Sequence, residues 1–296
     1  MNPRRLVFAG QAIVDVVLRV PALPERGGDV IATSAEITTG GGFNVMAAAA
    51  RQGLPVLYAG GHGTGPWGDL VRATLAAEGI EVLRPPDPGQ DTGFDVAMVE
   101  PDGERTFATH LGAETLESWP GIPMTPADVV YLSGYGLPRI SPLPSAAQMF
   151  MDPGPLVAQI PADLLDPVLA RCDWLSCNQR EAGLLSGSAD PSEAARLLLE
   201  RTGHASVMVR TGASGCVLAV RGEEMTRVPA PVVEAVDTTG AGDTHAGVFI
   251  AGLADGLSPA QAAARANAAA ALSVTRPGPA TSPTRAALDA WLADKG

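Results

Sequence analysis

The chain has 296 residues and a formal net charge of −12, and it contains no cluster of Lys and Arg. This balance argues against nucleic acid or an anionic membrane surface as a partner. Hydrophobic residues make up 46% of the chain and aromatic residues only 4%, so the core must be built mainly from Ala, Val and Leu, which suits helices packed on a parallel sheet. The length is that of one large domain, or of a domain with a small appendage.

The cysteines and the N-terminal segment indicate the cellular compartment of the protein. Cys172, Cys177 and Cys216 are odd in number and show no CxxC spacing, so they are expected to be reduced core residues and not a disulfide framework or a zinc site. The apolar run at residues 6–10 is too brief for a signal sequence, and no stretch approaches the ~18 apolar residues of a membrane span. We therefore expect a soluble, cytoplasmic protein.

The first half of the chain mixes strand, helix and hairpin signals. Residues 6–10 predict a buried strand, and the Ala-rich residues 44–51 predict a helix. Residues 14–39 hold short apolar runs separated by Pro and Gly, and residues 92–110 contain the turn signal Asp102-Gly103. Both segments predict β-hairpins. We expect them to form a small β-sheet lid over one edge of the molecule.

From residue 128 onward, buried strands alternate with helices. Helix starts are marked by Asp190 and Ser258, each followed by Pro and then by Glu or Gln three residues after the cap. The predicted strands cover residues 129–132, 149–151, 174–177, 207–209 and 216–218. Such alternation predicts a mostly parallel sheet with helices on both faces, so residues 1–296 are interpreted as a single α/β domain with the lid segments inserted.

The most informative motif is Asp237-Thr-Thr-Gly-Ala-Gly-Asp243, which precedes a run of small and apolar residues. Glycines at the start of a helix leave backbone N–H groups free, and these groups together with the helix dipole form an anion site. Asp243 could accept the proton of a hydroxyl that attacks a bound phosphate. The motif therefore indicates a small-molecule kinase. The alternative is a turn that needs glycine for its backbone angles, with Asp243 as a helix cap.

Two further motifs follow predicted strands. Asn178 and Glu181 come directly after residues 174–177, at the sheet edge where α/β folds bind ligands, and could hold Mg²⁺ and a phosphate oxygen. The same Asn-x-x-Glu spacing is that of a capping box. Residues 211–215 are explained by a tight hairpin turn, which could also line the phosphate or ribose of a nucleotide.

The N-terminal part carries candidates for binding a substrate hydroxyl. Gly40-Gly41-Gly42 precede Asn44 at the start of a helix, where the backbone could approach a ligand closely or form a hinge. Asp15 lies among apolar residues after the first strand and could bind paired sugar hydroxyls or be a solvated strand end. Residues 61–68 lack the Lys of a P-loop, and no GxGxxG follows a strand, which argues against a dinucleotide enzyme.

Taken in order, these motifs resemble the ribokinase (PfkB) family of sugar and nucleoside kinases over nearly the whole chain. The resemblance implies a ribokinase-like three-layer α/β sandwich with a mostly parallel central sheet and a small β-sheet lid. It implies ATP-dependent phosphorylation of a hydroxyl, expected to be a primary CH₂OH, on a sugar or sugar-like substrate. Asp243 would be the catalytic base, and the amides of Gly240, Ala241 and Gly242 would form the anion hole.

The resemblance also implies sets of ligand contacts. The substrate would be bound by Asp15, Gly41, Gly42, Asn44 and Asp243. ATP would contact Asn178, Thr211, Gly212, Gly215, Gly242 and Asn267. Mg²⁺ would be held by Asn178 and Glu181, directly or through water, and an activating K⁺ by Asp237, Thr239, Ser273, Arg276, Gly278 and Ser282.

Departures from the pattern leave the acceptor open. Ile13 stands where ribokinases proper carry an Asn, so the resemblance names a family and not ribose. A nucleoside kinase, with Phe43 as a stacking aromatic, and a sugar-phosphate kinase, with Arg105 and Arg139 as cationic contacts, are alternatives within the family. A non-catalytic sugar-binding protein is the alternative outside it. An exposed lid sheet could pair across a dimer axis, which would give a homodimer.

Overall fold

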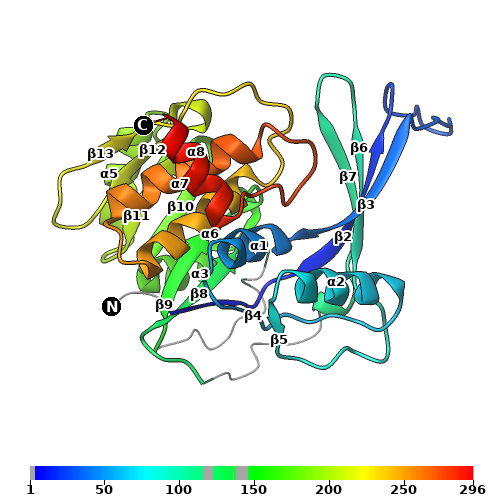
Figure 1. The fold of residues 1–296 in the computed structure, drawn as a ribbon, viewed down its shortest axis with the longest axis horizontal. Coiled ribbons are helices and arrows are strands. Elements are labelled where there is room, and N and C mark those ends of the chain that lie inside the picture. Colours follow the sequence, from blue (N-terminus) through cyan, green and yellow to red (C-terminus); the bar gives the residue numbers. More distant parts are fainter. Residues whose placement is uncertain (1–3, 116–122, 136, 138–145, 296) are drawn as a thin grey trace.

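Two β-sheets organise the computed structural model, which describes residues 4–115, 123–135, 137 and 146–295. In Figure 1 the larger sheet and its helices form the main body, and the smaller sheet stands to one side of it. The strands are β1 (Arg5–Phe8), β2 (Ala12–Arg19), β3 (Ser34–Gly41), β4 (Val56–Tyr58), β5 (Glu81–Val82), β6 (Phe94–Val99), β7 (Arg105–His110), β8 (Asp128–Ser133), β9 (Gln148–Asp152), β10 (Trp174–Asn178), β11 (Ser206–Arg210), β12 (Cys216–Ala219) and β13 (Thr226–Val228). The helices are α1 (Phe43–Arg51), α2 (Pro66–Ala77), α3 (Ala162–Arg171), α4 (Gln179–Ser186), α5 (Pro191–Arg201), α6 (Ala241–Ala254), α7 (Pro259–Ser273) and α8 (Arg285–Lys295).

The larger sheet is mostly parallel, as the alternation of strands and helices predicts. Its strand order in the described chain is β13-β12-β11-β10-β9-β8-β1-β4-β5, and the pairs from β11 to β5 are parallel. β12 and β13 extend one edge in antiparallel fashion. The predicted strands correspond to β1 and to β8 through β12. β4, β5 and β13 are only two or three residues long, which is too short for a periodic pattern to reveal them.

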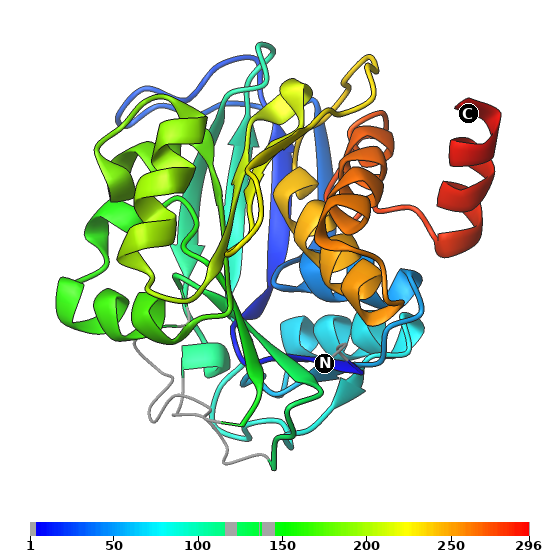
Figure 2. The same ribbon diagram turned by 90° about the vertical axis from the view of Figure 1, so that its left-hand side faces the viewer.

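Helices cover both faces of this sheet and complete the three layers. Figure 2 shows α3, α4 and α5 on one side, and α1, α6 and α7 on the other. On the α6 side, aromatic residues form a row with ring-centroid distances of 5.6 Å between Phe8 and Tyr131, 5.6 Å between Tyr131 and Phe150, and 6.2 Å between Phe150 and Phe249. Phe249 belongs to α6, so this row anchors the helix that begins at the predicted anion loop.

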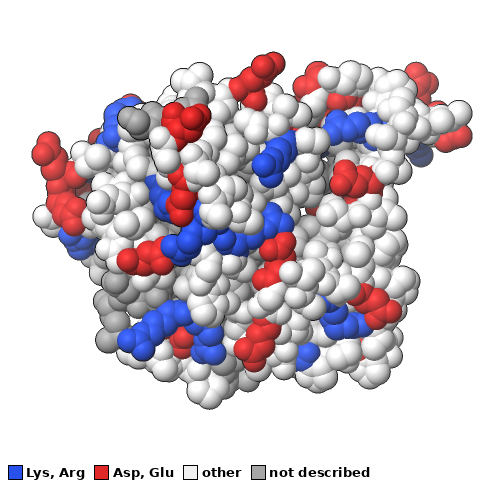
Figure 3. All heavy atoms as spheres, in the orientation of Figure 1, with Lys and Arg blue, Asp and Glu red and all other residues white. Residues whose placement is uncertain are grey.

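Burial and surface charge agree with the composition. Cys172, Cys177 and Cys216 are buried free thiols, as predicted. None of the helices in the described segments has the length and hydrophobicity that a membrane span requires. On the face drawn in Figure 3, acidic and basic side chains are interspersed, so the excess negative charge is not gathered into one patch there.

The smaller sheet is the lid that the two hairpin signals predict. Its strand order is β3-β2-β6-β7. β2 and β3 form one antiparallel hairpin and β6 and β7 the other, while β2 and β6 pair in parallel. The chain passes from β1 in the large sheet to β2 in the lid within residues 9–11. The lid is therefore joined closely to the central strands of the main body.

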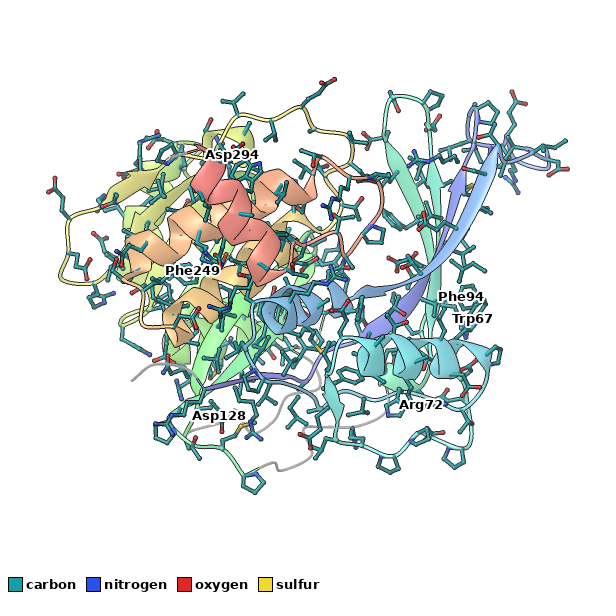
Figure 4. All side chains as sticks on the ribbon, in the orientation of Figure 1. Trp67, Arg72, Phe94, Asp128, Phe249 and Asp294 are labelled. Atoms are coloured by element: carbon teal, nitrogen blue, oxygen red, sulfur yellow. The ribbon has the colours of Figure 1, made fainter. Side chains whose placement is uncertain are left out.

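One face of the lid packs against α2. The ring centroids of Trp67 in α2 and Phe94 in β6 are 5.8 Å apart, and both are labelled in Figure 4. Val14 of β2 lies opposite Phe94 in the parallel register and shares this face. Because side chains alternate along a strand, Asp15 projects from the opposite face. That opposite face is not covered by α2.

Helices α1 and α6 approach so closely that only glycine fits at their crossing. A Cβ on Gly247 would lie 2.5 Å from the carbonyl oxygen of Val45 and 2.7 Å from the Cβ of Ala48. Neither contact can be relieved by rotating a side chain, because a backbone oxygen and a Cβ are fixed by the helix. This spacing matters for function because α1 carries Asn44 and α6 carries Asp243.

We expect Gly247→Ala to destabilise the fold by roughly 1–3 kcal/mol, because the added methyl group forces the two helices apart. Gly183→Ala in α4 is the matched control, since a Cβ there meets only the carbonyl oxygen of Ser188 at 3.4 Å. Alanine at this helical position should stabilise by up to about 1 kcal/mol. Urea denaturation followed by circular dichroism measures both variants. Equal stabilities would contradict the packing argument.

Candidate active site

The 237–243 motif forms a helix start without a side-chain cap. Gly240, which precedes the first residue of α6, adopts a left-handed conformation with φ of 71°. In the described part of the chain, the N–H groups of Gly240, Gly242 and Asp243 have no protein acceptor, whereas the N–H of Ala241 donates to the carbonyl oxygen of Thr238 at 3.3 Å. Free amides therefore lie at the positive end of α6. Ala241 differs from the expectation because its N–H closes the turn.

The carboxyl group of Asp243 lies between α6 and α1. Its Oδ2 accepts a hydrogen bond from Nδ2 of Asn44 at 3.4 Å. Asp243 as a residue is partly exposed, yet protein surrounds its carboxyl group. This burial, with the nearby charge of Asp152, raises its pKa to about 7, against the opposing effects of Asn44 and Arg210. A carboxyl group with such a pKa is suited to accept a proton near neutral pH.

An ion-pair network that the sequence analysis did not identify stands beside this site. Arg210, the last residue of β11, donates to Oδ2 of Asp152 at 2.7 Å and to Oγ of Ser176 at 2.8 Å. Its guanidinium also lies 3.7 Å from Oε2 of Glu181. The side chains of Arg210 and Asp152 are only 13% and 10% exposed. One buried cation thus balances two buried carboxylates.

The position of Arg210 makes it part of the candidate site. A Cβ on Gly242 would lie 3.5 Å from the central carbon of the Arg210 guanidinium, so the charge adjoins the anion loop. Arg210 and Asp152 are each the last residue of a strand whose three central residues are apolar. A charged residue at the carboxyl end of a buried parallel strand is the signal that could have identified both.

Asn178 and Glu181 form the capping box of α4. The Asn178 side chain accepts from the N–H of Glu181 at 2.9 Å, and the Glu181 carboxylate accepts from N and Nδ2 of Asn178, both at 2.8 Å. Glu181 is 2% exposed, and burial raises its pKa. Both of its carboxylate oxygens are engaged by protein donors. Within the described ranges, no three His, Cys, Asp or Glu side chains are grouped so that they could hold a metal ion.

A cleft of about 390 Å³ opens beside the anion loop. Of the residues expected to contact ATP, Asn178, Gly212, Gly215, Gly242 and Asn267 line it. Thr211 is not among its lining residues, because its N–H and Oγ1 both donate to the carbonyl oxygen of Gly215, at 2.8 and 3.0 Å, and close the turn. The other lining residues are Arg210, Ala213, Ala230, Pro231, Val232, Val233, Ala235, Thr238, Ala241, His245, Ala270, Ala271 and Val274.

Asn267 in α7 forms a fixed part of the cleft wall. Its Nδ2 donates to the carbonyl oxygen of Val228 at 2.9 Å, and its Oδ1 lies 3.0 Å from Nε2 of His245. Because Oδ1 can only accept, Nε2 of His245 is the donor. Burial lowers the pKa of His245 to about 3, so this imidazole is neutral. Asn267 is thereby held rigidly against the cleft.

Two of the residues expected to bind a monovalent cation, Thr239 and Gly278, contact the carboxylate of Asp237. Its Oδ1 accepts from N and Oγ1 of Thr239 at 2.9 and 2.6 Å, and its Oδ2 accepts from the N–H of Gly278 at 3.1 Å. The carbonyl oxygen of Ser273 accepts from the N–H of Arg276 at 3.2 Å. These bonds tie the segment before α6 to the segment after α7.

Glycines make room for Asp15 and for the turn from β3 into α1. A Cβ on Gly40 would lie 1.9 Å from Oδ2 of Asp15, and one on Gly42 would lie 1.9 Å from Cζ of Phe8. Gly41 has φ of 60°, a left-handed conformation that favours glycine. Gly40, which the sequence analysis placed in the candidate segment but not among the substrate contacts, is the glycine that Asp15 requires.

The lid face that carries Asp15 is turned toward the anion loop. Arg105 in β7 reaches from the lid to the main body, where its NH2 lies 2.5 Å from Oδ1 of Asp237. Burial, followed by the charges of Asp95 and Asp243, raises the pKa of Asp15 to about 7. Asp15 and Asp243 therefore lie within electrostatic range of each other, as expected for two sides of one site.

The structure also places the residues that were considered as contacts for alternative substrates. Phe43, considered as a stacking aromatic for a nucleoside, is 3% exposed and lies in the hydrophobic core. It cannot stack on a ligand. Arg105, considered as a phosphate contact, is engaged by Asp237. Arg139 lies outside the described residues.

The site combines an enclosed carboxyl group with free amides at the start of a helix, and it lies between a cleft and a lid. This is the arrangement of a small-molecule phosphotransferase. Residues 3–286 match the family described as pfkB family carbohydrate kinase. The chain belongs to this family.

Relatives and solved structures agree with this assignment. The chain is 32% identical to the uncharacterized sugar kinase YegV of Escherichia coli K12, over 95% of this chain and 91% of that protein. It is 30% identical to the ribokinase of Haemophilus influenzae, over 95% of this chain and 96% of that protein. A ribokinase structure from Thermotoga maritima matches with a TM-score of 0.82 at 25% identity, over 97% of this chain and 99% of that one. The ribokinase-like fold and the kinase class are thus confirmed.

The pKa of Asp243 predicts a pH-dependent stability difference. Because folding raises this pKa from 3.8 to about 7, the folded protein binds the proton more tightly, and the wild type loses stability as the pH rises through this window. Asp243→Asn has no such ionisation and should gain roughly 1–3 kcal/mol over the wild type between pH 5 and pH 8. Urea denaturation at both pH values measures this gain, with Asp29→Asn in an exposed loop as the control. The same difference at both pH values would contradict the pKa assignment.

Proposed function

We propose that this protein transfers the γ-phosphate of ATP to a hydroxyl group, specifically a primary CH₂OH, of a sugar or sugar-like acceptor. The observation that carries the proposal is the pairing of free amides at the start of α6 with the enclosed carboxyl group of Asp243. The adjoining cleft of about 390 Å³ supports ATP as the donor. The carboxylate of Asp15, presented by the lid on the other side, supports a hydroxyl-bearing acceptor.

In the proposed reaction, Asp243 accepts the proton of the acceptor hydroxyl as its oxygen attacks the γ-phosphorus, and ADP leaves. The amides of Gly240 and Gly242 donate hydrogen bonds to the phosphoryl oxygens on which charge develops. Arg210, which adjoins Gly242, adds positive charge at the same place. The lid limits the access of water, which would otherwise compete for the phosphoryl group.

Mg²⁺ is part of this proposal as the ion that accompanies ATP and neutralises phosphate charge. Asn178 lines the cleft, and Glu181 stands directly behind it. Because protein donors already engage both Glu181 oxygens, contact through water fits these residues better than a direct bond. Their part would be to orient the water molecules around the ion.

K⁺ is proposed as an activator. The candidate ligands are Asp237, Thr239, Ser273, Arg276, Gly278 and Ser282. Oγ of Ser282 is buried and has no partner, which fits a cation that takes hydroxyl and carbonyl oxygens. An ion held there would fix the backbone dipoles of the anion loop without touching the acceptor. Initial rates in K⁺ and in Na⁺ buffers of equal ionic strength measure its effect.

We also propose a homodimer formed through the lid, in the cytoplasm. Ile37 in β3 is 53% exposed and projects from the lid face opposite to that of Asp15, which supports a contact between lid sheets. The three buried free thiols support a reducing compartment. Light scattering after size exclusion determines the mass in solution, and a monomer at micromolar concentration would exclude the dimer.

Asp243→Asn tests the proposed base. We expect kcat to fall by roughly 10²–10⁴-fold, because no group remains to take the hydroxyl proton. In the wild type, kcat/KM should decline as the pH falls below about 7, where Asp243 becomes protonated. ADP formation is measured with D-ribose and D-fructose as acceptors. ATP affinity, measured by calorimetry, is the control and should be retained. A variant with near-normal kcat would exclude Asp243 as the base.

A further inference from the structure

Two carboxylates project side by side from the lid face that looks onto the anion loop. In the parallel register of β2 and β6, Asp15 lies directly opposite Asp95, so both side chains leave the same face of the sheet. Arg105 pairs with Val99, four residues along β6 from Asp95, and therefore belongs to this face as well. Since Arg105 reaches Asp237 in the main body, the face with Asp15 and Asp95 is turned toward the site.

Neither of these two lid carboxylates has a partner in the part of the chain that the structure describes. Among the described residues, Asp15 and Asp95 form no hydrogen bond or ion pair, although Asp95 is only 9% exposed and its Oδ1 is fully buried. Leaving a buried acceptor without a donor is unfavourable. Burial alone raises the pKa of Asp95 to about 6, and burial with the charge of Asp95 raises that of Asp15 to about 7. The arrangement destabilises the protein until donors arrive from outside.

A third unpartnered acceptor faces the same site from α1. Asn44 is 6% exposed, and its Oδ1 is buried without a partner, while its Nδ2 contacts Asp243. Asn44 comes from a different element than the lid, so its unpartnered oxygen independently indicates that a ligand binds here. Asp15, Asp95 and Asn44 all present acceptors. What the site lacks is therefore hydrogen-bond donors.

We propose that Asp95 is a second substrate-binding carboxylate, which acts with Asp15 to select a neutral polyhydroxylated acceptor and to disfavour phosphorylated ones. This inference rests on the proposed kinase function and deepens it. Each carboxylate accepts a hydrogen bond from a hydroxyl remote from the one that is phosphorylated. A phosphate group placed between Asp15, Asp95 and Asp243 would be repelled by them. Of the two arginines that the described lid strands place on this face, Arg105 is already engaged by Asp237, and Arg19 lies at the exposed end of β2.

Partial protonation lets the pair bind hydroxyl groups both as acceptor and as donor, whereas an ammonium group can only donate. Carboxyl groups with pKa values of about 6 and 7 retain part of their protons near neutral pH. One member can then donate to a hydroxyl oxygen while the other accepts from a hydroxyl hydrogen. An ammonium group has no lone pair to accept such a bond. Sugar hydroxyls can both donate and accept.

The test compares the wild type with Asp95→Asn in phosphorylation of D-ribose, D-fructose, D-glucosamine and fructose 6-phosphate by ATP. For the best neutral sugar, we expect Asp95→Asn to raise KM roughly 10–100-fold, as loss of a charged hydrogen-bond acceptor does, with little change in kcat or in KM for ATP. Asp102→Asn, at the exposed tip of the same hairpin, is the matched control and should leave all constants unchanged. Unchanged KM in Asp95→Asn, or a wild-type preference for fructose 6-phosphate or D-glucosamine, would overturn the inference.

Calorimetric binding of the same sugars separates this inference from the kinase function. If the wild type binds a neutral sugar and Asp95→Asn binds it roughly tenfold or more weakly, the inference stands even when no product forms. If the wild type forms product and Asp95→Asn binds and reacts equally well, only the inference fails. Absence of both binding and turnover with the neutral sugars overturns both. Thermal denaturation should show Asp95→Asn to be at least as stable as the wild type, because it removes a buried unpaired charge.

Discussion

The uncapped start of α6 is the feature on which the rest of the structure depends. Free amides at a helix start remain unsatisfied unless water or a ligand reaches them. Here Gly240 and Gly242 keep side chains out of the space in front of them. The aromatic row that ends at Phe249 and the tight contact at Gly247 hold α6 in place behind the loop. Because the donors are fixed before a ligand arrives, they need not reorient as charge develops during transfer.

Negative charge surrounds this positive helix end, and its balance sets the chemistry of the site. Asp243 and Asp152 lie close together with Arg210 as the opposing charge, and Asp15 approaches from the lid. Burial is the main reason why the pKa values of Asp243 and Asp15 rise to about 7, and the repulsion between these carboxylates adds to it. These buried carboxylates thus lower the stability of the fold at the candidate site, where the proposed reaction requires a proton acceptor and a group that binds hydroxyls.

An ion pair connects the lid with the segment that leads into the anion loop. Arg105 in β7 contacts Asp237, and the same carboxylate organises Thr239 and Gly278 around the segment that leads into α6. A ligand held by the lid and a phosphate held by the loop are therefore positioned by elements that touch each other directly. Near the attachment of the lid, Gly40 allows Asp15 to occupy its position, and Gly41 turns β3 into α1.

The sequence by itself determined the fold class, the lid hairpins and the anion loop, because alternating patterns, turn residues and helix caps act over a few neighbouring residues. Only the tertiary structure decided which side chains from distant elements meet at the site. Arg210 and Asp152 are single charged residues at strand ends, and they meet only when β9, β10 and β11 align. The register of β2 against β6 places Asp95 beside Asp15, and this register cannot be read from the sequence. Phe43, which was considered as a stacking aromatic for a nucleoside, lies in the core. The side of a helix that becomes buried depends on its packing with distant elements, which no local pattern records.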